Sequence, residues 1–214
     1  VEVFLMGYCG MRGSIGTDSV KPRVKTVAPD ELGSHARAMK ARGYAHSVVS
    51  LKALEAYMQG YGILLSGPVG TGKTLFFKLV EREPIAELPF SSVALWKYDR
   101  LDEWLQEHRY CDIVLDDVGA DKSGGDGARN FGQRYETLQI VLDARLKTDY
   151  RTHITTNMGS EALISTYDYR LVDRIYELTK PFVIPPGTVS LRAARPSTAA
   201  IRLMHKRRED CINA

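Results

Sequence analysis

Cysteine is scarce in this sequence, and its positions exclude the usual cysteine-based sites. Cys9, Cys111 and Cys211 lie far apart in the 214-residue chain, and they form neither a C-x-x-C pair nor a metal-ligand spacing. A cysteine-bound metal site and a dense disulfide framework are therefore excluded. The pattern favours a reduced, cytoplasmic setting.

Long apolar runs are also lacking. No run approaches the roughly 18 residues that a membrane-spanning helix needs. The first residues, VEVFLMGYCG, carry no basic segment ahead of a long apolar stretch. We therefore expect neither a membrane partner nor a signal peptide. No internal repeat is visible, which argues against solenoid and propeller folds.

Charge of neither sign dominates. The chain has 29 Lys and Arg against 26 Asp and Glu, and its formal net charge of +3 neither requires nor excludes a nucleic-acid partner. Two small basic clusters, within residues 21–25 and 206–208, are expected to be solvated tails. Apolar residues make up 44% of the chain, so a core of ordinary size can form.

Hydrophobic periodicity predicts strands that alternate with helices. Residues 1–30 lack a steady period, and we expect them to form an irregular N-terminal arm. The expected helices span residues 31–42, 48–58, 73–82, 99–108, 135–146, 160–165 and 169–178. The expected strands span residues 61–67, 91–98, 111–119, 151–158 and 182–187. This alternation predicts an α/β fold with a parallel sheet that is covered on both faces.

One glycine-rich stretch has a specific phosphate-binding pattern. GPVGTGKT, residues 67–74, fits G-x-x-x-x-G-K-[ST] and lies between a predicted strand and a predicted helix, as this motif requires. Glycines let successive backbone N–H groups turn inward around a phosphate, and the helix N-terminus adds partial positive charge. We expect Lys73 to reach the β- and γ-phosphates and Thr74 to bind Mg²⁺. The expected nucleotide-binding residues are Gly67, Pro68, Val69, Gly70, Thr71, Gly72, Lys73, Thr74 and Leu75.

Two adjacent acids end the apolar run IVLDDVG, residues 113–119. An unpaired buried carboxylate is costly, so a positive partner is expected where this strand ends. Mg²⁺ together with Lys73 would be that partner. We expect Asp116 to bind the metal, and Asp117 to orient or deprotonate the water that attacks the γ-phosphate. An ordinary turn after the strand is the alternative for this pair.

A further predicted strand also ends in polar residues. HITTNM, residues 153–158, places Thr155, Thr156 and Asn157 at the carboxyl end of the strand, and such residues in a parallel sheet face the ligand crevice. We expect Asn157 to hold the attacking water against the γ-phosphate. A simple turn is the alternative.

Two arginines, Arg170 and Arg174, lie one turn apart on one face of a predicted helix. They could simply pair with a nearby acid, namely Asp168, Asp173 or Glu177. The sharper hypothesis is that one arginine reaches into the nucleotide site of a neighbouring subunit. An arginine in that role is worth about 10³–10⁵ in rate.

Taken in order, these four motifs resemble the AAA+ ATPases of the DnaC/IstB group, over about residues 45–195. The resemblance identifies GPVGTGKT as Walker A and IVLDDVG as Walker B, with Asp in place of the more usual second Glu. It implies a three-layer P-loop NTPase sandwich with a central parallel sheet, in which an additional strand lies between the Walker A and Walker B strands. The ATPase domain is then expected at residues 31–195, followed by a basic tail at 196–214.

The same resemblance implies roles for individual residues. It matches Asn157 to sensor 1. It matches Arg174 to the arginine finger, with Arg170 as the runner-up. The stretch TVSLRAAR, residues 188–195, lies where the group carries its sensor 2 arginine, which makes Arg192 the first choice and Arg195 the second.

The resemblance implies an ATPase that uses ATP and Mg²⁺ and assembles with its own copies, with ATP between subunits and slow turnover that assembly or DNA stimulates. The implied role is that of a helicase loader in DNA replication initiation, with a replicative helicase and single-stranded DNA as partners. One alternative is a transposition helper that acts with a transposase on duplex DNA. Others are a nucleotide-gated interaction module with negligible hydrolysis and, less well supported, a small-molecule kinase.

Overall fold

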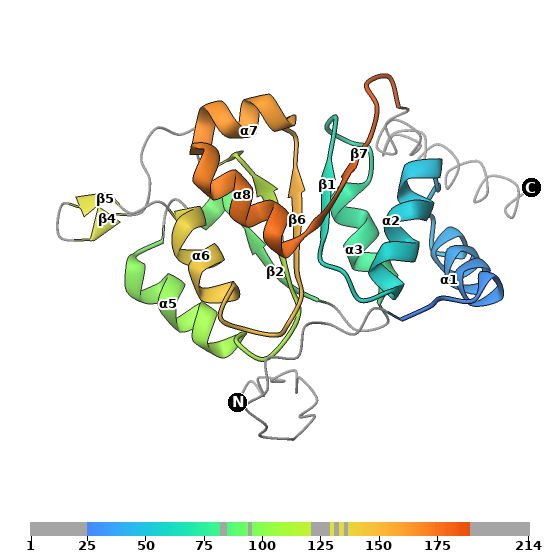
Figure 1. The fold of residues 1–214 in the computed structure, drawn as a ribbon, viewed down its shortest axis with the longest axis horizontal. Coiled ribbons are helices and arrows are strands. Elements are labelled where there is room, and N and C mark those ends of the chain that lie inside the picture. Colours follow the sequence, from blue (N-terminus) through green and yellow to red (C-terminus); the bar gives the residue numbers. More distant parts are fainter. Residues whose placement is uncertain are drawn as a thin grey trace, which may run out of the picture.

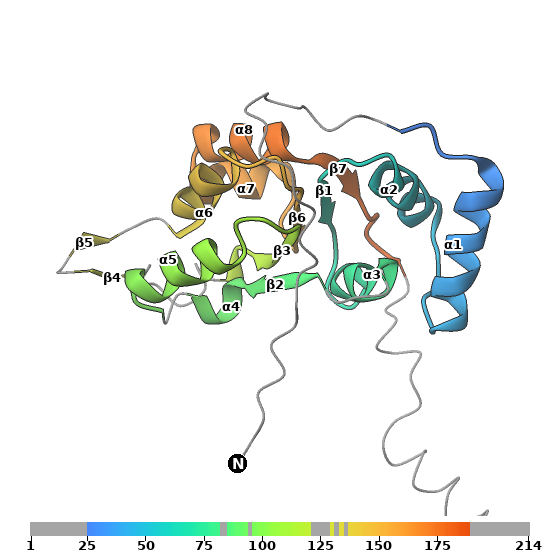
Figure 2. The same cartoon turned by 90° about the horizontal axis from the view of Figure 1, so that it is seen from below.

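The computed structural model describes residues 25–81, 85–93, 96–120 and 137–188, together with the backbone of two short strands between them. These residues form a sheet with helices on both faces (Figures 1 and 2). The helices are α1 (Pro29–Ala41), α2 (Val48–Met58), α3 (Lys73–Val80), α4 (Phe90–Val93), α5 (Tyr98–Glu107), α6 (Thr137–Arg145), α7 (Ser160–Tyr167) and α8 (Tyr169–Leu178). The strands are β1 (Ile63–Ser66), β2 (Ala86–Pro89), β3 (Ile113–Val118), β4 (Arg129–Asn130), β5 (Gln133–Arg134), β6 (Thr152–Thr156) and β7 (Lys180–Val183).

The main sheet has five parallel strands in the order β2-β3-β6-β1-β7. The strand β6 therefore lies between β1, which leads into the glycine-rich loop, and β3, which ends in the two acids. This confirms the parallel α/β sandwich and the additional strand that the sequence motifs implied. The two remaining strands, β4 and β5, form a separate antiparallel pair.

The sheet carries a hydrophobic core on each face. In β1, Leu64 points into one core, and Ile63 and Leu65 point into the other, as the alternation of side chains along a strand requires. The first core packs against α4 to α8, and the second packs against α1, α2 and α3 (Figure 2). Because both faces are buried, β1 and β3 begin with continuous apolar runs instead of alternating ones.

One predicted strand, at residues 91–98, is wrong. The helix α4 begins this segment, and the strand lies just upstream, as β2. Phe90 and Val93 are three residues apart and fully buried, so a single helical turn points both into the same core. The strand β2 ends in Pro89, which is tolerated because β2 lies at the edge of the sheet.

Other expected elements are present with shifted ends. The helix α1 begins at Pro29, inside the segment expected to be irregular, and the Lys25 N–H donates a hydrogen bond to the Gln59 carbonyl oxygen (3.1 Å). The last strand begins at Lys180, two residues before the expected start, and ends at Val183. In the described part of the chain, the helices are too short or too polar to cross a membrane.

The fully buried Arg145 ties together the segments that precede β3 and β6. Its guanidinium donates one hydrogen bond to the Thr152 hydroxyl (3.0 Å) and others to four backbone carbonyl oxygens in these segments. A buried charge is costly unless such partners surround it. The amino-terminal ends of the two strands are thereby fixed, which helps to hold their carboxyl ends in register.

The strand β6 also carries a fully buried base, His153. Its Nδ1 accepts a hydrogen bond from the Ile63 backbone N–H (3.2 Å), and the centroids of the Tyr57 and Phe77 rings each lie 5.0 Å from its own. In the described part of the chain, its Nε2 has no hydrogen-bond partner. Burial, with a contribution from two nearby arginines, lowers the pKa of His153 well below its usual range. The imidazole is therefore neutral in the folded protein.

Acid is expected to destabilise the fold through His153. Below about pH 6.5 the unfolded chain binds a proton on this residue, whereas the folded chain does not until its lower pKa is reached. Above about pH 6.5 the titration of His153 does not lower the free energy of unfolding. Below about pH 6.5 it lowers the free energy of unfolding by up to about 1.4 kcal/mol per pH unit. Urea unfolding of the wild type and His153→Asn between about pH 5 and 8 measures this loss.

An asparagine side chain at this position would retain an oxygen for the Ile63 N–H, so the variant isolates the titration. We expect His153→Asn to flatten the pH dependence of the free energy of unfolding. Equal slopes for the wild type and His153→Asn would contradict the assignment of this titration to His153.

Candidate active site

The loop between β1 and α3 has a conformation that its glycines allow. Gly67, Gly70 and Gly72 have φ angles of 144°, 84° and 88°, which residues with a side chain rarely adopt. At Gly67 space is also limiting, because a Cβ atom there would lie 2.7 Å from the Ile184 carbonyl oxygen. The loop then leads directly into α3, so the N-terminus of this helix begins where the glycines end.

Lys73, the first residue of α3, joins this loop to the end of β6. Its buried ammonium donates hydrogen bonds to the carbonyl oxygens of Gly67 (2.8 Å) and Pro68 (2.9 Å) and to Oδ1 of Asn157 (2.7 Å). The positive charge thus lies at the carboxyl ends of β1 and β6. This is the position that the motif predicts for a lysine that binds phosphates.

Thr74 and Asp116 form the next contact. The Thr74 hydroxyl donates a hydrogen bond to Oδ1 of Asp116 (2.8 Å). In the described part of the chain no group of three or more His, Cys, Asp or Glu could hold a metal. One carboxylate beside one hydroxyl instead fits Mg²⁺, which proteins commonly hold with one or two carboxylates and the phosphates of a nucleotide.

The two acids lie within an irregularity of β3. Leu115 pairs with Ile154 and Val118 pairs with Thr156, so the β3 segment is one residue longer than the β6 segment that it faces. Such a bulge inserts an extra residue and redirects the strand. Asp117 occupies it with a φ of 58°, one of two positive values outside glycine in the described part of the chain. The bulge explains how two consecutive residues can face the same cavity.

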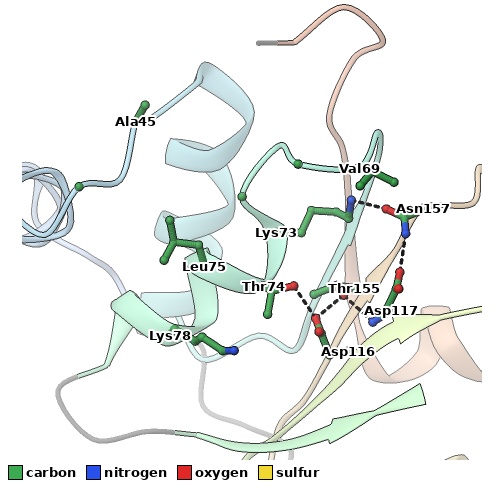
Figure 3. Close-up of a pocket in the computed structure, with 13 residues that line it drawn as sticks. Ala45, Val69, Lys73, Thr74, Leu75, Lys78, Asp116, Asp117, Thr155 and Asn157 are labelled. Atoms are coloured by element: carbon green, nitrogen blue, oxygen red, sulfur yellow. Dashed lines mark hydrogen bonds between the residues drawn. The ribbon is translucent and has the colours of Figure 1, made fainter. Parts of the chain in front are cut away.

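Asn157, the residue after β6, links the lysine to the second acid. Its Oδ1 accepts the hydrogen bond from Lys73, and its Nδ2 donates one to Oδ1 of Asp117. Both ends of the amide are thereby fixed. Lys73, Asn157 and Asp117 form a continuous line across the carboxyl edge of the sheet (Figure 3).

These residues line a single cavity of about 580 Å³. Figure 3 shows Lys73 and Thr74 approaching it from α3, the two acids from β3, and Asn157 from β6. A cavity of this size can take a nucleotide. Its lining residues are Gly43, Ala45, Val69, Gly70, Gly72, Lys73, Thr74, Leu75, Lys78, Asp116, Asp117, Thr155 and Asn157.

Three lining residues were not predicted from the sequence: Gly43, Ala45 and Lys78. Gly43 and Ala45 belong to the loop between α1 and α2, which no local signal connects to the glycine-rich loop. Lys78 lies on α3 and pairs with Glu87 of β2 (3.1 Å). Thr155 does face the cavity, as expected of a polar residue at the carboxyl end of a parallel strand, but the sequence assigned it no role.

The two predicted arginines that the structure describes, Arg170 and Arg174, are not among the cavity-lining residues. Arg174 forms an ion pair with Asp143 of α6, which is none of the nearby acids that were expected to compete for it. Its side chain is 36% exposed. Arg170 is exposed on the same helix. Arg192 and Arg195 lie outside the described residues, as do both basic clusters except Lys25.

Several solved structures are similar to this one. DnaI matches with a TM-score of 0.53 and 19% identity, over 75% of this chain and 96% of that chain. A primosome component from Streptococcus pyogenes matches with a TM-score of 0.48 and 18% identity, over 78% of this chain and 86% of that chain. The DnaC helicase loader matches with a TM-score of 0.47 and 19% identity, over 71% of this chain and 99% of that chain. No family model and no curated protein matches the sequence.

The likeness to DnaI shows the fold of this chain. It agrees with the fold that the motif resemblance implied. At 19% identity the likeness shows the fold of this chain but not its activity, because activity depends on the residues of the site.

Proposed function

We propose that this chain binds ATP in the cavity at the carboxyl edge of its sheet and hydrolyses it to ADP and phosphate. One observation carries the proposal: a lysine, a threonine, two acids and an asparagine converge on the glycine-rich loop from three separate elements. The phosphates would lie against the loop between Gly67 and Thr74. The base would lie toward Gly43 and Ala45, which line the cavity from the loop between α1 and α2.

The roles of the residues follow from their contacts. Lys73 would exchange its carbonyl partners for the β- and γ-phosphate oxygens. Thr74 and Asp116 would hold Mg²⁺, which neutralises charge on those phosphates when it is bound. Asp117 would orient the attacking water and accept its proton, and Asn157 would hold that water in line. Both roles require the side chains of Asp117 and Asn157 to lie beside the γ-phosphate. A lysine that binds this phosphate would bring it close to Asn157, because Lys73 donates a hydrogen bond to Asn157.

We further propose that active sites form between copies of the chain. Arg174 is not in the cavity lining of its own chain, so it can act on a γ-phosphate only in a neighbouring copy. Its surface ion pair with Asp143 is of the kind that contributes about 0–1 kcal/mol, so the arginine can leave it at little cost. Turnover would then depend on protein concentration.

The proposed biological role is that of a helicase loader on single-stranded DNA, which rests on the motif resemblance. A transposition helper remains the second candidate, because it shares every motif. Phosphate release measured with single-stranded and with duplex DNA separates the two roles. Stimulation by single strands supports the loader, whereas a preference for duplex supports the helper. Negligible hydrolysis under all conditions supports a nucleotide-gated interaction module.

Lys73→Ala is expected to weaken ATP binding by roughly 30-fold or more, because a buried charge that pairs with the phosphates is lost. Lys78→Ala is a matched control, since Lys78 lies on the same helix and lines the same cavity. We expect the control to bind ATP within a few-fold of the wild type, with both measured by titration calorimetry. No heat from the wild type, or equal affinity for Lys73→Ala, would refute the ATP site.

A further inference from the structure

We propose that Thr155 is a positioning residue that holds both acids of the site, Asp116 and Asp117, in place. It lies at the end of β6 and is buried. Its hydroxyl donates a hydrogen bond to Oδ1 of Asp116 (2.7 Å) and accepts one from the backbone N–H of Asp117 (2.8 Å). One side chain thus contacts both acids, the first through its carboxylate and the second through its backbone. Because these acids act in a proposed ATP site, the inference rests on the proposed function.

The bulge in β3 makes such a contact necessary. Val114 and Leu115 point into opposite cores, and Val118 joins the core of Leu115, so one residue is inserted between Leu115 and Val118. The positive φ of Asp117 assigns the insertion to this residue. An inserted residue leaves the regular ladder, and its N–H needs another partner. The Thr155 hydroxyl supplies that partner, and it thereby supports the left-handed backbone of Asp117.

The same hydroxyl fixes the carboxylate of Asp116. Thr74 of α3 and Thr155 of β6 both donate a hydrogen bond to its Oδ1. These two hydrogen bonds fix the orientation of the carboxylate. Hydroxyls that donate to a carboxylate keep their oxygen lone pairs available, which leaves Thr74 able to face a metal ion. Partners behind a metal ligand commonly tune its metal affinity or activity by about 10–100-fold.

The next residue provides a matched control. Thr156 is equally buried, and its hydroxyl also contacts β3, but it donates to the backbone carbonyl oxygen of Val118 (2.7 Å) and accepts from the Met158 N–H (3.1 Å). Neither of these two bonds is made to an acid. A valine at position 155 or 156 removes one hydroxyl without changing the shape of the side chain, so the two variants separate positioning of the acids from general stability.

We expect Thr155→Val to lower the turnover number by about 10–100-fold with little change in KM. In calorimetry it should lose the gain in ADP affinity that Mg²⁺ gives the wild type, while its affinity in EDTA stays unchanged. Thr155→Ser, which keeps the hydroxyl, should restore both properties. Thr156→Val should resemble the wild type in both, even where its melting temperature falls.

Amide hydrogen exchange without nucleotide tests the positioning by itself. The Asp117 amide is expected to exchange faster in Thr155→Val than in the wild type, Thr155→Ser or Thr156→Val. Equal exchange and equal Mg²⁺ dependence in the Thr155→Val and Thr156→Val variants would overturn the inference. A wild type that binds no nucleotide would instead refute the ATP site, and the exchange rates would still decide whether Thr155 holds Asp117.

Discussion

Arg174→Ala is expected to lower ATP hydrolysis by about 10³-fold or more while the chain still binds ATP with wild-type affinity. The two effects separate because Arg174 pairs with Asp143 and does not line the cavity of its own chain. An arginine that meets the γ-phosphate from a neighbouring copy stabilises charge only in the transition state, so its loss affects turnover and not ATP binding to the isolated chain. Steady-state phosphate release and calorimetry measure the two quantities.

Mixing of variants tests whether the arginine acts between copies. Arg174→Ala keeps an intact cavity, and Asp117→Asn keeps an intact arginine, so a mixed assembly restores complete sites. When equal amounts of the two variants assemble at random, about a quarter of the interfaces should pair an intact cavity with an intact Arg174. A chain carrying both substitutions is the control, because mixing it with Arg174→Ala restores no complete site.

A substitution of Arg170 tests which of the two arginines, Arg170 or Arg174, acts as the finger. Arg170→Ala removes the same charge from the same helix, one turn earlier, and we expect it to keep most of the wild-type turnover. A large loss with Arg170→Ala and none with Arg174→Ala would assign the finger to Arg170. Failure of the mixed variants to recover activity would show that Arg174 does not act between copies.

The parts of the fold and site that are local in sequence could be predicted. The glycine-rich loop, its flanking strand and its helix form one continuous segment, and the spacing of Gly67, Lys73 and Thr74 is dictated by the phosphate that they would surround. The acids and Asn157 were located because each follows an apolar strand, and parallel strands end at one edge of the sheet. The structure brings these residues together.

The remaining features depend on contacts between segments distant in sequence. The partner of Arg174 is Asp143, 31 residues earlier, and no spacing rule connects them. The loop that carries Gly43 reaches the cavity only through the packing of α1 and α2 onto α3. The short strand β2 was missed because its edge position, which permits Pro89, is a property of the assembled sheet.

The bulge is the most instructive of these features. Two adjacent acids in a regular strand point to opposite faces, so a regular strand could not direct both Asp116 and Asp117 to the one site that the motifs predict for them. The extra residue in β3 resolves the conflict, and it is visible only in the pairing with β6. Functional sites commonly contain such departures from regular geometry.

Asp117→Asn is expected to stop hydrolysis while it leaves the site assembled. Asparagine accepts positive φ values as readily as aspartate, so the φ of 58° at this position imposes no new strain. Its Oδ1 can still accept the hydrogen bond from Asn157. The substitution therefore removes only the negative charge and the basicity of the side chain.

Loss of the base should cost about 10²–10⁴ in the rate of a single turnover. ATP affinity should stay the same or rise, because a negative charge facing the phosphates is removed. Asp168→Asn is the matched control: Asp168 also has a positive φ, of 76°, and its carboxylate also accepts a hydrogen bond, but it caps α8 outside the cavity lining. We expect this control to hydrolyse ATP at the wild-type rate. Full turnover in Asp117→Asn would instead mean that the second acid only holds Asn157, and that the attacking water is activated by the phosphates themselves.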